Sequence, residues 1–184
     1  MVEAEEPSPA AADRLLLAAA QGRRLSPGEL QLVLAHVAQA GFDPHARERA
    51  RGELAGIVWR GQMLQGSSWL PPAKRHSLKH VLVRHEWPDS TTLEDYLASI
   101  RAVILDPMSG VATRNYQQRG WHLTIARHSG SWRGPRGSSW ILVDYRVLTG
   151  HWQTAFQFPE DPALKLHEGA TDVRWQRRPR EWRR

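Results

Sequence analysis

GVATRNYQQRGWHLTIARHS, residues 110–129, is the stretch that decides the fold of this chain. It holds two strand-like runs, 110–120 and 121–129, which meet at a glycine. Two more runs of the same kind follow, SWILVDYRVL (139–148) and GHWQTAFQF (150–158), after turns rich in glycine or serine. Because these connections are short, the simplest topology is a four-stranded antiparallel meander.

Helical signals fill the chain before this meander. Asp13 is placed to cap a first helix, which Gly22 ends. Ser26 and Glu29 have the spacing of a capping box for a second helix. A third helical pattern begins at Asp43 and a fourth covers residues 89–107. Helices followed by strands predict an α+β domain, in which N-terminal helices pack on one face of a four-stranded antiparallel sheet.

The composition narrows the classes of function. The 184 residues suffice for one globular core, and a net charge of +6 with a pI of about 10.4 favours nucleic acid or an acidic protein as a partner. The absence of cysteine excludes disulfides, thiolate metal sites and a cysteine nucleophile. No apolar run approaches the roughly 20 residues of a membrane span, and the acidic N-terminus lacks the features of a signal peptide. We expect a cytoplasmic protein, or one delivered into the cytoplasm of a target cell.

The segment KRHSLKHVLVRHEWP (74–88) places three histidines among four lysines and arginines. Three interpretations stay open: a metal site, a solvated basic face, and a general base with cationic helpers. His76 and His80 have the i, i+4 spacing that suits zinc on a helix. The glutamate of an HExxH motif is missing, however, and the neighbouring cations would repel a metal. No metal or other cofactor is expected.

The third interpretation is cleavage of RNA without a metal. The 2′-hydroxyl of RNA is the nucleophile, so a catalyst supplies a base, an acid and cations for the phosphoryl oxygens. Histidine suits the base because its pKa lies near neutrality, and a neighbouring cation lowers that pKa and keeps the imidazole neutral. Thr154, beside His151 in the last strand, offers a hydroxyl to the phosphate. We expect Arg127 and Arg146, on neighbouring strands, to face the same pocket.

These residues resemble the barnase–EndoU–colicin–RelE-like (BECR) ribonucleases. The likeness rests on the histidine-bearing segment, on TTLEDYLASIRAVILDP (91–107) and on the strands that end in GHWQTAFQFP (150–159). It covers roughly residues 65–160. It is greatest for toxin domains of bacterial polymorphic or contact-dependent toxins and of phage-associated proteins.

The resemblance implies roles for particular residues. His80 matches the catalytic histidine, Arg84 matches its cationic helper, and Thr154 with Phe156 matches the end of the last strand. The expected catalytic residues are His80, Arg84, Thr154 and His85. The expected substrate-binding residues are Lys79, Arg127, Arg146, Trp152 and Phe156. Trp152, beside a histidine, is a candidate for stacking on a nucleobase.

Four parts are expected along the chain. Residues 1–12 form a disordered leader, 13–64 a helical pre-toxin segment, 65–173 the α+β nuclease-like domain, and 174–184 a mobile basic arm. The expected partners are RNA and an acidic immunity protein or antitoxin that covers the basic cleft. Two alternatives stay open: a non-catalytic nucleic-acid-binding domain, and a non-enzymatic interaction module of a larger assembly.

Overall fold

The computed structural model describes residues 9–40, 93–117, 120–134, 137–158 and 166–179. Within them lie the helices α1 (Pro9–Ala20), α2 (Pro27–Gln39) and α6 (Leu93–Leu105). The strands are β1 (Gly110–Tyr116), β2 (Gly120–Gly134), β3 (Gly137–Arg146), β4 (His151–Phe158) and β5 (Asp172–Arg177). The chain is therefore an α+β protein, as the sequence predicts.

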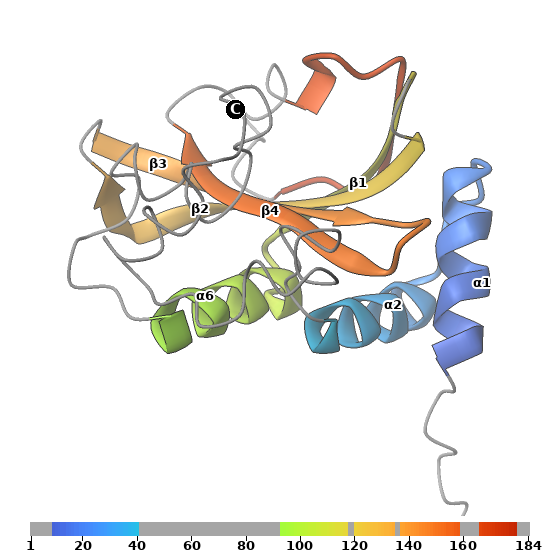
Figure 1. Cartoon of the computed structure of the whole chain (residues 1–184), viewed down its shortest axis with the longest axis horizontal. Coiled ribbons are helices and arrows are strands. Elements are labelled where there is room, and N and C mark those ends of the chain that lie inside the picture. Colours follow the sequence, from blue (N-terminus) through green and yellow to red (C-terminus); the bar gives the residue numbers. More distant parts are fainter. Residues whose placement is uncertain (1–8, 41–92, 118–119, 135–136, 159–165, 180–184) are drawn as a thin grey trace, which may run out of the picture.

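The strands form a single antiparallel sheet in the order β4-β3-β2-β1-β5. The first four strands make the predicted meander, in which β2, β3 and β4 each pair with the strand before them (Figure 1). Gly120 is the first residue of β2, and Gly150 directly precedes β4. Their φ values are +74° and +68°, a conformation that favours glycine, so the chain reverses at each of them at low cost.

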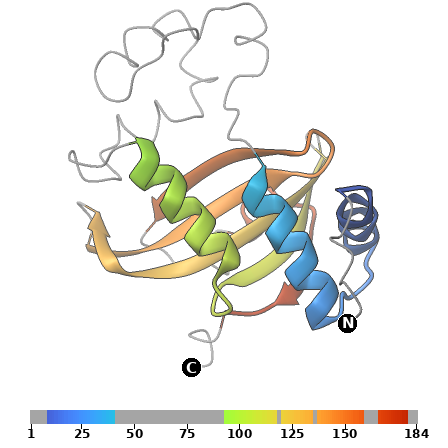
Figure 2. The same cartoon turned by 90° about the horizontal axis from the view of Figure 1, so that it is seen from below.

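One face of the sheet is covered by the helices. α2 and α6 lie side by side across this face, with α1 against α2 (Figure 2). Every second residue of the central strands points into the layer between them, because side chains alternate along a strand. The sheet contributes Val111, Leu123, Ile125, Val143 and Tyr145 to this core, and all are buried.

The N-terminal helices share this core with the sheet. α1 begins at Pro9, inside the stretch expected to be a disordered leader, and ahead of the expected cap at Asp13. The predicted capping box of α2 is present: Glu29 N–H donates to Ser26 Oγ at 3.3 Å, and Ser26 N–H donates to Glu29 Oε2 at 2.9 Å. The described part of the expected pre-toxin segment therefore packs as one unit with the sheet.

Trp152 of β4 joins the sheet to α2. Its side chain is 1% exposed, and its indole N–H donates to Val37 O at 2.6 Å. Arg101 of α6 lies over the same ring, 5.5 Å from the centroid. This burial contradicts the expectation that Trp152 stacks on a nucleobase, because both its ring and its polar atom are used inside the fold.

β5 occupies residues that were expected to begin a mobile basic arm. Arg174 donates to Ala20 O at 2.8 Å, at the end of α1, and Arg177 donates to Ser109 O at 2.7 Å, between α6 and β1. The expectation is wrong for these two arginines, because the carbonyls at the helix ends hold their guanidinium groups. Residues 180–184 of the expected arm lie outside the described residues.

Trp152 provides a test of the shared core. Trp152→Ala should lower the free energy of unfolding by about 3–5 kcal/mol, because it leaves a cavity between the helices and the sheet. Trp152→Phe should cost about 1 kcal/mol through the lost hydrogen bond to Val37, whose carbonyl keeps a second donor, Ala40 N–H. Urea denaturation measures both. The control is Leu148→Ala, at a side chain that is 77% exposed, and a comparable loss there would contradict the assignment.

Candidate functional site

Two arginines and two histidines lie in a row across the sheet face opposite the helices, which we call the far face. His151 of β4 pairs with Arg146 of β3, Arg146 pairs with His122 of β2, and His122 pairs with Arg114 of β1. Cross-strand partners project from the same face, with their Cβ atoms about 5 Å apart. The register therefore brings two imidazoles and two guanidinium groups together from four adjacent strands; we call these four residues the basic row.

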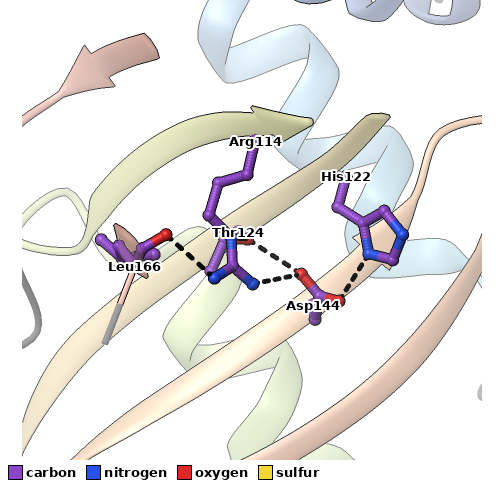
Figure 3. A network of polar contacts seen from close by, with 5 residues as sticks. All are labelled: Arg114, His122, Thr124, Asp144 and Leu166. Atoms are coloured by element: carbon purple, nitrogen blue, oxygen red, sulfur yellow. Dashed lines mark hydrogen bonds and ion pairs between the residues drawn. The ribbon is translucent and has the colours of Figure 1, made fainter. Parts of the chain in front are cut away.

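A buried polar network lies between the basic row and the next row of the far face (Figure 3). His122 Nδ1 is 2.6 Å from Asp144 Oδ2, and Thr124 Oγ1 donates to Asp144 Oδ1 at 2.8 Å. Arg114 completes it, since its NH2 group is 3.1 Å from Asp144 Oδ1 and its Nε–H donates to Thr124 Oγ1 at 2.7 Å. A second amino group of Arg114 donates to Leu166 O at 3.3 Å. The carboxylate of Asp144 thus joins three strands, and Arg114 links them to the segment before β5.

The alternation of side chains explains why polar groups gather here. Residues 122 and 124 of β2 and residues 144 and 146 of β3 have the parity opposite to that of the apolar core residues. The antiparallel register sets Thr124 opposite Asp144 and His122 opposite Arg146. The network is therefore a consequence of strand pairing and not of closeness in sequence.

Asp144 remains ionised although it is buried. Burial by itself would raise the pKa of its carboxyl group. The hydrogen bond and charge interaction with His122, the charge of Arg114 and the hydrogen bond from Thr124 together outweigh burial, and the pKa lies well below its usual range. Arg114 is 4% exposed and Asp144 is 6% exposed, so each charge depends on the other for compensation.

Asp144 also determines the hydrogen bond that His122 makes. An ionised carboxylate can accept but cannot donate, so Nδ1 of His122 carries a proton and donates it to Asp144 Oδ2. The second nitrogen, Nε2, points away from Asp144 (Figure 3) and is buried without a hydrogen-bond partner. Tyr116 packs against the ring edge to face, with centroids 4.9 Å apart. A histidine oriented by a carboxylate, with its other nitrogen unused, is an arrangement suited to proton transfer or to binding a polar ligand.

The structure separates two arginines that were expected to share a pocket. Arg127 belongs to the helix side of β2 by its parity, and its NH1 group is 3.0 Å from Asp106 Oδ2 at the end of α6. Arg146 lies on the far face, opposite His122. The expected common pocket of Arg127 and Arg146 is therefore wrong, because these residues project from opposite faces of the sheet.

The other expected site residues are distributed as follows. Thr154 is the cross-strand partner of Asp144, so its backbone position belongs to the far face next to the network. Phe156, also on β4, is half-buried and packs against Leu142 of β3 and Leu166. The remaining expected residues lie outside the described residues: Lys79, His80, Arg84 and His85.

Sequence reasoning missed the buried network. The sequence does carry one signal of it: His122 and Thr124 in β2 and Asp144 in β3 are polar residues that alternate with apolar ones. A polar residue at such a position usually faces solvent, however, so the pattern gives no indication that these side chains are buried together. Their proximity depends on the register between β1, β2 and β3, which sequence alone leaves open.

Among the described residues, no group of three or more histidine, aspartate or glutamate side chains could hold a metal ion. In the same part of the chain, no helix has both the length and the apolar character needed to cross a bilayer. Comparison with protein-family models, curated proteins and solved structures gave no match to this chain. Function is therefore inferred from the chain's own residues.

The buried carboxylate provides a stability test. Asp144→Asn should lower the free energy of unfolding by about 3–5 kcal/mol at pH 7, because Arg114 keeps a buried charge without its counter-ion. Asp172→Asn is the matched control. It breaks the half-exposed pair with Arg174 and should cost at most about 1 kcal/mol.

The same comparison has a defined pH dependence. The folded pKa of Asp144 is lowered, so its ionisation stabilises the fold fully above the unfolded pKa of about 3.9. This contribution is lost as the pH falls toward the folded pKa. In urea denaturation, the stability difference between the native chain and Asp144→Asn should be constant above about pH 5 and shrink below about pH 4. A difference that grows on acidification would contradict the assigned network.

Proposed function

We propose that this chain is a metal-independent endoribonuclease of the toxin type, which binds RNA along the far face of its sheet. The observation that carries the proposal is the basic row, in which Arg114, His122, Arg146 and His151 come from four adjacent strands. RNA cleavage needs proton-transfer groups near neutrality and cations beside the phosphate, and the row contains both kinds of side chain.

The reaction proposed is the internal transesterification of RNA. A base takes the proton of the 2′-hydroxyl, the 2′-oxygen bonds to phosphorus, and the bond to the 5′-oxygen breaks as an acid protonates that oxygen. The products are a 2′,3′-cyclic phosphate and a 5′-hydroxyl. His80 is the base that the resemblance suggests, and Thr154, on the far face, is the hydroxyl proposed to contact the phosphate.

Charge favours RNA as the ligand. The described arginines of the helix side and of β5 are largely engaged by carboxylates or carbonyls, as Arg127 is by Asp106 and Arg177 is by Ser109 O. Arg146, in contrast, has no carboxylate partner in the described part of the chain. A half-buried guanidinium group without a counter-ion favours an anionic ligand. An acidic immunity protein covering the same face would use the same complementarity.

A non-catalytic RNA-binding domain is the second candidate. It is favoured by one observation: His122 is 2% exposed, as expected for an imidazole with a structural role. The two candidates differ in a measurable way, because a binding domain retains RNA without cutting it.

The first test is cleavage of total cellular RNA in EDTA. The proposed enzyme should keep its activity, and its products should carry a 2′,3′-cyclic phosphate. His80→Ala should lower the single-turnover rate on the order of 10²- to 10⁴-fold by removing the general base. The Kd for RNA should barely change, because a neutral imidazole contributes little to phosphate attraction. RNA that is bound but never cut would favour the binding domain, and loss of cleavage in EDTA with recovery in zinc would overturn the metal-free mechanism.

The second test locates the RNA on the sheet. Arg146→Ala should weaken RNA binding and reduce the salt dependence of the affinity by about one phosphate contact. Arg127→Ala is the matched control, since it removes an arginine of the helix side that is already paired with Asp106. Equal effects of the two substitutions would exclude the far face as the RNA-binding surface.

A further inference from the structure

Two buried nitrogen atoms of the basic row have no hydrogen-bond partner. They are Nε2 of His122 and Nε of Arg146, and both are in the part of the chain that the structure describes. A buried polar atom left without a partner costs about 1–3 kcal/mol, so such atoms are rare in folded proteins. Two of them on paired residues indicate a site whose partner is a ligand.

The register brings these two residues close together. His122 and Arg146 are directly opposite each other on β2 and β3. The next pair of residues along the two chains, Trp121 and Val147, is joined by a backbone hydrogen bond from Val147 N–H to Trp121 O at 3.1 Å. Hydrogen-bonded and non-hydrogen-bonded pairs alternate in an antiparallel ladder, so His122 and Arg146 form a non-hydrogen-bonded pair, in which side chains approach most closely.

The charges around the pair favour an anion. Arg114 and Asp144 compensate each other through their 3.1 Å contact, and within the described residues no carboxylate compensates the guanidinium group of Arg146 beside His122. His151, on the other side of Arg146, is half-buried and carries no negative charge. Among the residues that the structure describes, the groups that face His122 are the Arg114–Asp144 ion pair, the Tyr116 ring and the guanidinium group of Arg146.

We propose that His122 and Arg146 form a binding site for a phosphate group, which under the proposed ribonuclease function is a phosphate of the RNA substrate. Arg146 supplies the charge and guanidinium donors. Nε2 of His122, which the fold leaves unused, supplies a hydrogen bond to the phosphate. Because both nitrogens are buried, the half-buried Arg146 side chain changes rotamer on binding and carries its guanidinium group onto the anion.

Asp144 is a positioning residue in this site. Its bond to Nδ1 orients the imidazole and leaves Nε2 for the ligand. Arg114 and Thr124 fix the carboxylate in turn, through contacts of 3.1 Å and 2.8 Å to Oδ1. The floor of the site is therefore rigid before the phosphate arrives, which lowers the entropic cost of binding.

The test is a titration of the full chain with inorganic phosphate, and separately with a ribonucleoside 3′-monophosphate, followed by the ring ¹⁵N resonances of histidine. In the free protein, Nδ1 of His122 should have the ¹⁵N shift of a protonated nitrogen, because it donates to Asp144. Phosphate should shift the Nε2 resonance and leave that of Nδ1 in place. An unchanged His122 spectrum at saturating phosphate would overturn the site.

Substitutions at His122 separate binding from folding. His122→Asn keeps a nitrogen donor at the position of Nδ1 for Asp144 but removes Nε2, and it should weaken phosphate binding roughly 10- to 100-fold. His122→Gln places its amide nitrogen near the position of Nε2 and should retain more of the affinity than His122→Asn. Urea denaturation of both variants reports whether the fold persists. If His122→Asn folds and binds phosphate as tightly as the native chain, the proposal is wrong.

Arg146→Lys tests the guanidinium group against charge alone. It keeps the charge but loses the planar, forked donors, so we expect weaker phosphate binding than in the native chain. Arg127→Lys, on the helix side of the sheet, should leave phosphate binding unchanged, and an equal loss in both variants would contradict the site. Phosphate binding at His122 in a chain that cuts no RNA would uphold the site and refute the proposed ribonuclease. RNA cleavage with no phosphate response at His122 would refute the site and uphold the proposed ribonuclease.

Discussion

The antiparallel register between β2 and β3 is the constraint on which the rest of the structure depends. Polar and apolar residues alternate over residues 122–125 of β2 and 143–146 of β3, so the pairing decides which set meets the helices. Leu123 and Tyr145 are paired on the helix side, and Thr124 and Asp144 are paired on the far face. A slip of one residue in either strand would bring a charged group into the apolar core. The cost of burying an unpaired charge thus excludes the neighbouring registers.

The second consequence of this register is a buried ion pair at the centre of the sheet. Such a pair adds little net stability compared with apolar residues of the same volume, because both groups lose their hydration. Its effect is on specificity, since Asp144 is satisfied when His122, Thr124 and Arg114 reach it from two other strands. The network therefore favours one arrangement of β1, β2 and β3. It also holds a histidine in a defined orientation on rigid strands, which is what a functional site requires.

The proposed functions follow from a difference between the two faces of the sheet in how their arginines are paired. The helix side uses its cations within the fold, as shown by Arg127 at Asp106 and by Arg101 over Trp152. On the far face, no carboxylate of the described residues pairs with Arg146, which lies beside an imidazole whose second nitrogen is unused. The two faces therefore differ in their affinity for anions even though both carry arginine. Net charge alone, which is a property of the whole chain, makes no such distinction.

The sequence by itself determined the α+β class, the N-terminal cap of α2 and the meander of β1 to β4. These features depend on residues close together in the chain: the capping box of Ser26 and Glu29, the alternation within each strand, and the glycines at the turns. The tertiary structure decided the addition of β5, the burial of Trp152 and the faces of Arg127 and Arg146. It also decided the joining of Arg114, His122 and Asp144, which are 8 to 30 positions apart in sequence. These outcomes depend on strand register and on packing against the helices, where the energy of a contact depends on distant residues. A local pattern carries no information about that energy, because polar residues at alternating strand positions are compatible with exposure to solvent and with a buried network alike.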